Sequence, residues 1–216
     1  MIIDPSELDT HSVYKLLIGA VVPRPIAWVS SRSRDGVLNL APYSFFNVVS
    51  REPPMLAFSV GPRTGGESYP KDTLTNIRES QEFVINIVSV PLANAMHETS
   101  INHPPEVDEF ERAGVTPADC VVIDTPRVAE AKISMECSLE HLLKLGSDHL
   151  VIGRMQRYHV DDDLISNGRI DTLKLDPLAR LAGDFSRIQT IFDLPLDDDC
   201  CDQQRPGWCR WVQYCR

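Results

Sequence analysis

The stretch between residues 20 and 60 constrains the fold most strongly, because it has room only for strands joined by short turns. An Asp35-Gly36 pair is typical of a two-residue hairpin and marks one reversal of the chain. Pro23 and Pro25 favour a sheet edge or a bulge early in the first strand, and Pro42 is expected to break a later one. Consecutive strands connected so tightly run antiparallel. The strands expected here are residues 20–30, 37–40, 44–49 and 55–60.

The rest of the sequence adds strands and only short helices. No regular alternation of strands with helices is present, and no G-x-G-x-x-G follows a strand, so the pattern argues against a doubly wound dinucleotide-binding fold. Gly19 is expected to end the first helix, and Gly153 to mark a bulge or a close approach within a strand. We therefore predict a mainly β protein, an antiparallel barrel with inserted helices. The expected helices are residues 12–17, 74–80, 91–99 and 108–113, and the further strands are 82–88, parts of 127–145, and 149–160.

The net charge argues against some classes of binding partner. The 216 residues carry a formal net charge of -10 with a pI of about 5.0, which argues against nucleic acid or an anionic membrane as the main partner. No run approaches the roughly 18 apolar residues of a membrane-spanning helix. Residues 1–7 are acidic and lack the basic and apolar regions of a signal peptide, so the expected location is the cytoplasm.

The C-terminal tail changes composition abruptly. Four of the six cysteines lie in the last 17 residues, together with two of the three tryptophans. Their spacing matches no standard zinc pattern, so no metal site is expected. We divide the chain into a domain of residues 1–196 and an atypical, poorly ordered tail of residues 197–216. Cys120 and Cys137 lack any local activating pattern and are expected to be core residues.

Lys71, Asp72 and Thr73 open a predicted helix, which allows two interpretations. Asp72 or Thr73 can cap its first turn, and the lysine is then simply solvated. A helix N-terminus also carries free N–H groups and about half a positive charge, so a lysine and a hydroxyl there suit a phosphate. Arg63, in the preceding loop, would add a second cation.

A cluster of aromatic and small polar residues also allows two interpretations. Ser44, Phe45, Phe46 and Asn47 combine apolar walls with donors and acceptors, as a flat aromatic ligand requires, and Trp28 could supply another wall. Equally, Phe45 and Trp28 could belong to the core while Ser44 and Asn47 are turn residues.

His149 enters a predicted strand from a Gly146-Ser147-Asp148 turn. It could face a pocket and donate to a ligand or relay a proton, or it could be structural or exposed. No G-x-S-x-G, H-E-x-x-H or Walker motif is present, so the sequence indicates no nucleophilic triad, zinc protease or nucleotide-binding loop.

Short motifs spread over most of the chain form an ordered set. They are Arg24 to Ser31 (RPIAWVSS), Asn39 to Asn47 (NLAPYSFFN), Pro53-Pro54, Lys71-Asp72-Thr73 with Asn76-Ile77, Phe83 to Asn86 (FVIN), Ala95-Met96 with Thr99-Ser100, Val107 to Phe110 (VDEF), Ala113-Gly114, Gly153, and Arg180 to Gly183 (RLAG). In order and separation they resemble the flavin reductase-like, FMN-binding split-barrel family. The resemblance covers about Ser12 to Phe192; each motif alone is weak, and the ordered set is fairly specific.

The resemblance implies a six-stranded antiparallel split β-barrel of the Greek-key type, with short peripheral helices. It further implies a homodimer that holds FMN in a groove near the subunit interface. The implied cofactor-binding residues are Lys71, Asp72 and Thr73 with Arg63 at the phosphate; Ser44, Phe45, Phe46 and Asn47 along the isoalloxazine and ribityl; Trp28 and Ser30 facing the ring; and Ser59 and Arg24 as further candidates. Two positions depart from the family: Ser31 stands where threonine is common, and Phe185 where tyrosine is frequent.

By this resemblance the chain is an FMN-containing oxidoreductase. Hydride passes from NADH or NADPH to FMN and electrons pass on to free flavin or another acceptor, while the protein orients the partners. His149 would at most orient the nicotinamide or relay a proton. The alternative is an FMN-binding electron carrier without NAD(P)H activity. A scaffold that has lost FMN is a third option, against which the intact Lys71-Asp72-Thr73 motif argues.

Overall fold

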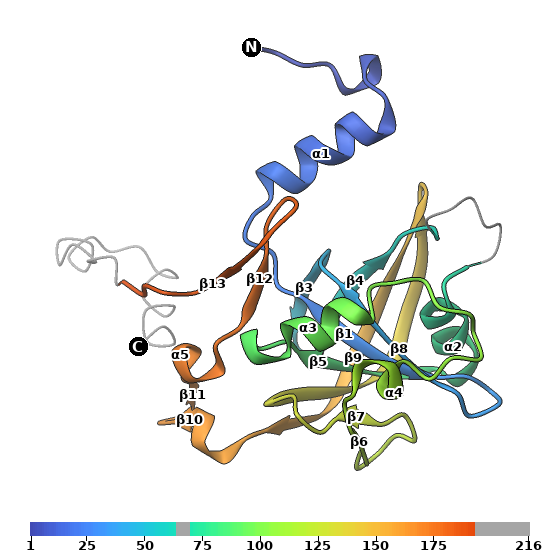
Figure 1. Ribbon diagram of the computed structural model, residues 1–216, viewed down its shortest axis with the longest axis vertical. Helices are drawn as coiled ribbons and strands as arrows, with labels where there is room; N and C mark the ends of the chain where they lie inside the picture. Colours follow the sequence, from blue (N-terminus) through green and yellow to red (C-terminus); the bar gives the residue numbers. More distant parts are fainter. Residues whose placement is uncertain (64–69, 193–216) are drawn as a thin grey trace.

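The computed structural model describes residues 1–63 and 70–192, and one antiparallel sheet of seven strands dominates it. The sheet has the order β2-β1-β5-β8-β9-β4-β3 and curls into a split barrel (Figure 1). The mainly β barrel is therefore confirmed, with seven strands in place of six. The strands are β1 (Ala27–Arg32), β2 (Leu38–Tyr43), β3 (Phe46–Arg51), β4 (Pro54–Val60), β5 (Glu82–Ile87), β8 (Ile133–Leu145) and β9 (Asp148–Val160).

Short helices and three small strand pairs surround this sheet. None of the described helices is long and apolar enough to cross a bilayer. The helices are η1 (Pro5–Glu7), α1 (Thr10–Ala20), α2 (Asp72–Ser80), η2 (Val90–Leu92), α3 (Ala93–Glu98), α4 (Glu109–Ala113), η3 (Asp162–Leu164) and α5 (Thr172–Leu175). The pairs are β6 (Pro117–Ala118) with β7 (Arg127–Val128), β10 (Ile165–Ser166) with β11 (Arg169–Ile170), and β12 (Leu178–Arg180) with β13 (Phe185–Arg187).

The chain reverses around Asp35-Gly36 as expected, with Gly36 at a φ of 89°. The loop is longer than a two-residue turn, because the Ser33 N–H donates to the Val37 carbonyl at 2.9 Å. The expected break at Pro42 is wrong, because β2 runs through this residue and the chain reverses instead at Ser44-Phe45. Pro42 is tolerated because β2 lies at one end of the sheet, where a strand has one side without a hydrogen-bonding partner. After the reversal at Ser44-Phe45, β3 does not pair with β2, and the two strands lie at opposite ends of the strand order.

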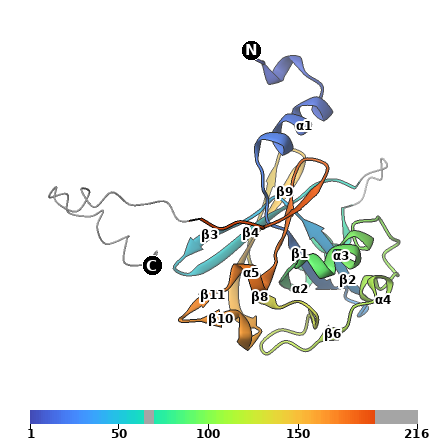
Figure 2. The same ribbon diagram turned by 60° about the vertical axis from the view of Figure 1, so that its left-hand side comes forward.

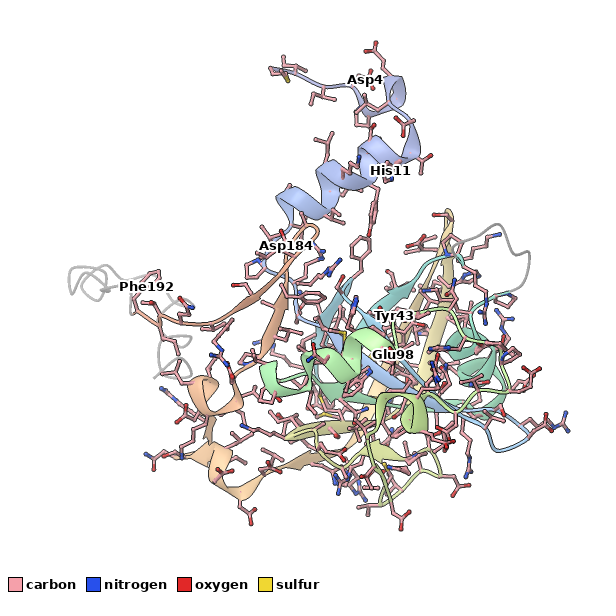
Figure 3. The ribbon with its side chains drawn as sticks, in the orientation of Figure 1. Asp4, His11, Tyr43, Glu98, Asp184 and Phe192 are labelled. Carbon is pink, nitrogen blue, oxygen red and sulfur yellow. The ribbon has the colours of Figure 1, made fainter. Side chains whose placement is uncertain are left out.

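The N-terminal arm differs most from the expectation. Helix α1 continues through Gly19 to Ala20, so Gly19 does not end it, and β1 begins only at Ala27, because two prolines occupy the intervening segment. Figures 1 and 2 show α1 standing away from the barrel, and Figure 3 places Asp4 and His11 on this projecting arm.

The barrel interior is apolar and closely packed. The rings of Phe58 and Phe83 meet edge to face with centroids 5.6 Å apart. A Cβ at Gly153 would lie 2.3 Å from Cζ of Phe83, so the expected close approach is confirmed and only glycine fits. Cys137 is wholly buried here, as expected, whereas Cys120 is only partly buried, outside the barrel.

The segment between β5 and β8 covers the outer face of β1, β5 and β8. Its apolar side chains pack around Trp28 in a second core. Backbone N–H groups of this covering segment donate to three buried or half-buried side chains of the sheet, Glu82, Asn86 and Glu136. Both faces of β1 are therefore buried.

Candidate functional site

Two adjoining cavities along β2 form a groove, and they share Pro42 and Ser100 on their walls. A larger depression of about 600 Å³, beside the β1–β2 turn, contains none of the candidate residues. The inner pocket has a volume of about 60 Å³ and is lined mainly by Asn39, Tyr43, Arg63, Lys71, Asp72, Thr73, His103 and Glu109. The outer pocket has a volume of about 220 Å³ and is lined mainly by Tyr14, Arg24, Ser44, His97, Arg180 and Phe185.

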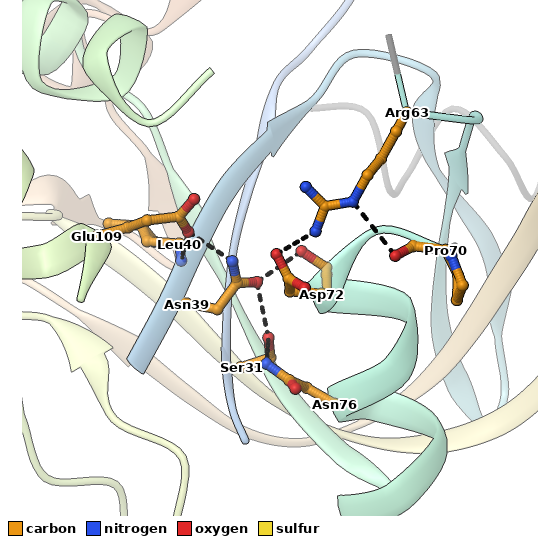
Figure 4. A network of polar contacts seen from close by, with 9 residues as sticks. Ser31, Asn39, Leu40, Arg63, Pro70, Asp72, Asn76 and Glu109 are labelled. Carbon is orange, nitrogen blue, oxygen red and sulfur yellow. Dashed lines mark hydrogen bonds and ion pairs between the residues drawn. The ribbon is translucent and has the colours of Figure 1, made fainter. Parts of the chain in front are cut away.

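The inner pocket is cationic at the start of α2. Arg63 is buried, forms an ion pair with Asp72 and donates to the Pro70 carbonyl at 3.4 Å (Figure 4). The Lys71 ammonium lies 5.6 Å from the centroid of the Tyr43 ring. Burial, reinforced by the charge of Arg63, lowers the pKa of Lys71. Asp72 is already paired with Arg63, so the Lys71 ammonium is the cation left to meet a ligand, and an anionic ligand would offset the burial that lowers its pKa.

The backbone at the start of α2 also faces this pocket. Asp72 and Thr73 come before the first hydrogen bond of the helix, in which the Leu74 N–H donates to the Lys71 carbonyl at 3.0 Å. The N-cap is Lys71, and its side chain makes no capping bond, so the expectation that Asp72 or Thr73 caps the helix is wrong. The first N–H groups are left for other acceptors.

Asn39 connects the pocket floor to α2. Its amide nitrogen donates to Glu109 at 2.5 Å, and its carbonyl oxygen accepts from Thr73 at 2.6 Å and from Ser31 at 3.0 Å (Figure 4). Thr73 is buried, and its proton is committed to Asn39. The network therefore fixes the start of α2 against β2.

Glu109 is a buried acid that the sequence analysis did not single out. One carboxylate oxygen accepts from the Leu40 N–H at 2.6 Å as well as from Asn39. Burial raises the pKa of Glu109 to about 7, opposed chiefly by the bond from Leu40. Its charge therefore changes near neutral pH, within the wall of the inner pocket.

Two buried polar atoms of the inner pocket have no hydrogen-bond partner within the described ranges. They are the Tyr43 hydroxyl and Nε2 of His103. Burial raises the pKa of Tyr43, against a smaller opposing effect of the nearby Thr73 hydroxyl, so Tyr43 keeps its proton as a donor. A buried polar atom without a partner costs about 1–3 kcal/mol. Ligand oxygens in this pocket would remove that cost.

Arg24 has a structural role at the edge of the outer pocket. Its guanidinium donates to the carbonyls of Ile18 at 2.8 Å, Val21 at 2.7 Å and Leu181 at 2.8 Å. It thereby ties the end of α1 to the β12–β13 hairpin, whose turn at Asp184 is labelled in Figure 3. Within the outer pocket, which Arg24 also lines, its Nε lies 3.4 Å from the Ser44 hydroxyl oxygen.

The side chains of residues 44–47, which follow β2, lie on different surfaces, and only some of them reach the groove. Ser44 lines the outer pocket, whereas Phe46 packs against the barrel core. Phe45 is exposed, with its ring centroid 6.5 Å from that of Tyr14. Asn47 is exposed and accepts from the Val48 N–H. Ser59 lies across from Phe45 and donates its N–H to the Phe45 carbonyl at 2.9 Å, away from the groove.

The structure does not bring Trp28, Ser30 or His149 to the groove. The Trp28 indole is wholly buried in the second core and donates to Thr99 at 2.8 Å, and Ser30, also wholly buried, donates to the Pro126 carbonyl at 2.7 Å. These two side chains leave no surface for a flavin ring, because the covering segment occupies their side of β1. His149 pairs with Val60 across the β4–β9 ladder and lines neither pocket.

Four residues of the outer pocket were not predicted as site residues. Arg180 was quoted only within a motif and Phe185 only as a departure from the family, and Tyr14 and His97 were not singled out. The Arg180 guanidinium lies 4.4 Å from the centroid of the Phe185 ring. Tyr14 and His97 complete an aromatic, partly cationic wall. Such a wall suits a flat, electron-poor ring system.

Residues 19–186 match the protein family described as flavin reductase like domain. A protein of Halalkalibacterium halodurans is 43% identical over 189 residues, which are 85% of this chain and 90% of the relative. Among solved structures, nitrilotriacetate monooxygenase component B from Bacillus cereus has a TM-score of 0.85 and 41% identity, covering 90% of this chain and 98% of the other. The 2-nitrobenzoate 2-nitroreductase of Pseudomonas fluorescens has a TM-score of 0.81 and 30% identity, covering 92% and 97%.

Proposed function

The chain belongs to the flavin reductase like family, and on that premise we propose that it is an FMN-containing oxidoreductase that takes electrons from NADH or NADPH. The observation that carries the proposal is the inner pocket, where Lys71, Arg63 and two buried polar atoms without partners converge. A phosphate monoester would give anionic oxygens to the Lys71 ammonium and an acceptor to the Tyr43 hydroxyl, with Arg63 adding its charge from its ion pair with Asp72.

The residues fit the two ends of FMN. At the phosphate, Lys71 and Arg63 would neutralise charge and Tyr43 would donate its hydroxyl proton. The first residues of α2 line the same pocket, and their N–H groups are not used by a side-chain cap. At the flavin ring, the outer pocket offers Ser44 as a small polar neighbour between aromatic walls. The two pockets share a wall, so a single elongated ligand can occupy both.

FMN supplies hydride and electron transfer when it is bound, and the protein contributes binding and orientation. The Asn39 network holds α2 and β2 in register, which fixes the two ends of the groove. Arg24 holds α1 and the β12–β13 hairpin at the outer pocket. The electron acceptor is proposed to be free flavin or another small oxidant; the named relatives are a monooxygenase component and a nitroreductase.

We further propose that two copies of the chain associate. Strand β3 is an edge of the sheet, and Val48 and Val49 on it are 61% and 52% exposed. Leu16 and Leu17 on α1 are also exposed, on an arm that projects from the barrel. An apolar edge that has no strand partner among residues 1–63 and 70–192 favours pairing with another chain. Sedimentation should give a dimer mass, and Val48→Lys should shift it toward the monomer while Leu173→Lys should not.

Anaerobic addition of NADH or NADPH to the FMN-loaded protein tests the proposed activity. Bleaching of the bound flavin is expected within seconds to minutes, without a partner protein. Flavin that stays oxidised would favour the electron carrier instead. His149 stays a predicted nicotinamide contact, and His149→Gln should slow bleaching without changing FMN affinity if that prediction is right.

A further inference from the structure

Three possible metal ligands converge on the outside of the barrel, apart from the groove. They come from three separate segments: Cys120 from the segment that covers the sheet, Glu136 from β8 and His159 from β9. The thiol sulfur, one carboxylate oxygen and one imidazole nitrogen lie within 4.8 Å of one another. Cys120 and His159 are partly buried, so the cluster lies beneath the surface but within reach of solvent.

Glu136 is an unusual residue to find at this depth. Its side chain is wholly buried, and it accepts from the Val121 and Val122 N–H groups at 2.8 and 2.9 Å. Nε2 of His159 lies 2.6 Å from the same carboxylate. Burial by itself raises the pKa of Glu136, but the two backbone N–H groups and His159 together lower it below its ordinary value.

The thiol of Cys120 lies in a negative environment. Burial raises the pKa of Cys120 to about 12, and the charges of Glu136 and Glu82 add to the increase while Arg127 opposes it. A divalent cation reverses this effect, because it stabilises the thiolate and offsets the buried carboxylate together.

We propose that Cys120, Glu136 and His159 form a zinc-binding site, with water as the fourth ligand. Sulfur, imidazole nitrogen and carboxylate oxygen are the ligands that Zn²⁺ takes in proteins, and a thiolate disfavours Mg²⁺ and Ca²⁺. Tetrahedral geometry with bonds of about 2 Å places two light-atom ligands about 3.3 Å apart. The His159–Glu136 separation of 2.6 Å must widen accordingly, which the partly exposed imidazole can accommodate.

Zinc uptake displaces protons from the site. Cys120 loses its thiol proton to solvent. The proton by which Nε2 of His159 contacts Glu136 must also leave, either to solvent or to Nδ1, before Nε2 can present its lone pair to the metal. Glu136 keeps its two backbone N–H donors, which orient the carboxylate toward the metal. Bound zinc then fastens the covering segment to β8 and β9, so it should raise the stability of this face of the barrel.

The tail cysteines complicate a direct test, because they can bind zinc by themselves. The starting protein is therefore the full chain with Cys200, Cys201, Cys209 and Cys215 changed to serine. After chelator treatment it is dialysed against buffered Zn²⁺ and its metal content is measured. Co²⁺ is titrated in parallel, because a Co²⁺–thiolate bond gives its own near-ultraviolet absorption.

We expect about one Zn²⁺ per chain and a Co²⁺–thiolate band. Cys120→Ser should abolish the band and His159→Gln should remove most of the zinc, whereas the exposed His141→Gln should leave both unchanged. Zinc should raise the melting temperature of the starting protein and not that of Cys120→Ser. The proposal is overturned if the starting protein retains no zinc, or if Cys120→Ser retains the same zinc and cobalt signals. FMN binding is independent of this site, so its measurement checks that each variant folds.

Discussion

Replacing Lys71 with alanine tests the phosphate end of the groove most sharply. The ammonium stands above the Tyr43 ring, half-buried beside Arg63, in a pocket of about 60 Å³. A charge-assisted hydrogen bond contributes about 1.5–3 kcal/mol, so Lys71→Ala should raise the dissociation constant for FMN by about 10- to 150-fold.

The same variant should not destabilise the fold. Burial and Arg63 lower the pKa of Lys71, so the folded protein binds its proton less tightly than the unfolded chain does. Its charge is therefore unfavourable to folding at neutral pH, and the melting temperature of Lys71→Ala without ligand should stay the same or rise.

Fluorescence titrations with FMN and with riboflavin complete the test. Riboflavin lacks the phosphate, so Lys71→Ala should weaken FMN and leave riboflavin nearly unchanged. Lys144→Ala, on the exposed end of β8, is the matched control and should change neither. An FMN dissociation constant that Lys71→Ala does not alter, or an equal loss for both ligands, would refute the phosphate assignment.

Three further predictions concern stability. The pKa of Glu109 is raised in the folded state to about 7, so its contribution to stability falls as pH rises from 4.5 to 7; Glu109→Gln should remove that part of the pH dependence in urea unfolding. Gly153→Ala should destabilise by about 1–3 kcal/mol through overpacking against Phe83, whereas Gly19→Ala, with open space and a helical position, should stabilise by about 0.5–1 kcal/mol. Arg24→Lys replaces a guanidinium that donates to three carbonyls from two nitrogens with a single ammonium, and should lower the free energy of unfolding by about 1–3 kcal/mol, measured in the same way.

Local chemistry allowed much of the fold to be predicted. The Asp35-Gly36 turn, the strand now described as β4 and the close approach at Gly153 depend on backbone conformation and side-chain volume, which residue types report directly. Pro42 and Gly19 were misjudged because their effects depend on context. A proline is tolerated at a sheet edge, and a glycine is tolerated in a helix whose neighbours favour it.

The site was predicted less completely, for a physical reason. Which side of a strand faces a ligand depends on what covers the other side. The partners that cover Trp28 and Ser30, Thr99 and Pro126, lie 71 and 96 residues further along the chain. Trp28 and Ser30 were therefore assigned to the ring, although the covering segment buries them. Glu109 and His103 reach the inner pocket from the same distant segment, and no local pattern near Lys71 indicates them. The assignments to residues 193–216 lie outside the described residues.

The most direct test of the account is a titration of the flavin-free, purified protein with FMN, followed by visible absorption and flavin fluorescence. We predict saturable binding of about one FMN per chain, with a perturbed flavin spectrum and an affinity at least about 10-fold higher than that for riboflavin. No spectral change at any FMN concentration, or equal affinity for the two flavins, would contradict the claim that the groove along β2 binds FMN through its phosphate.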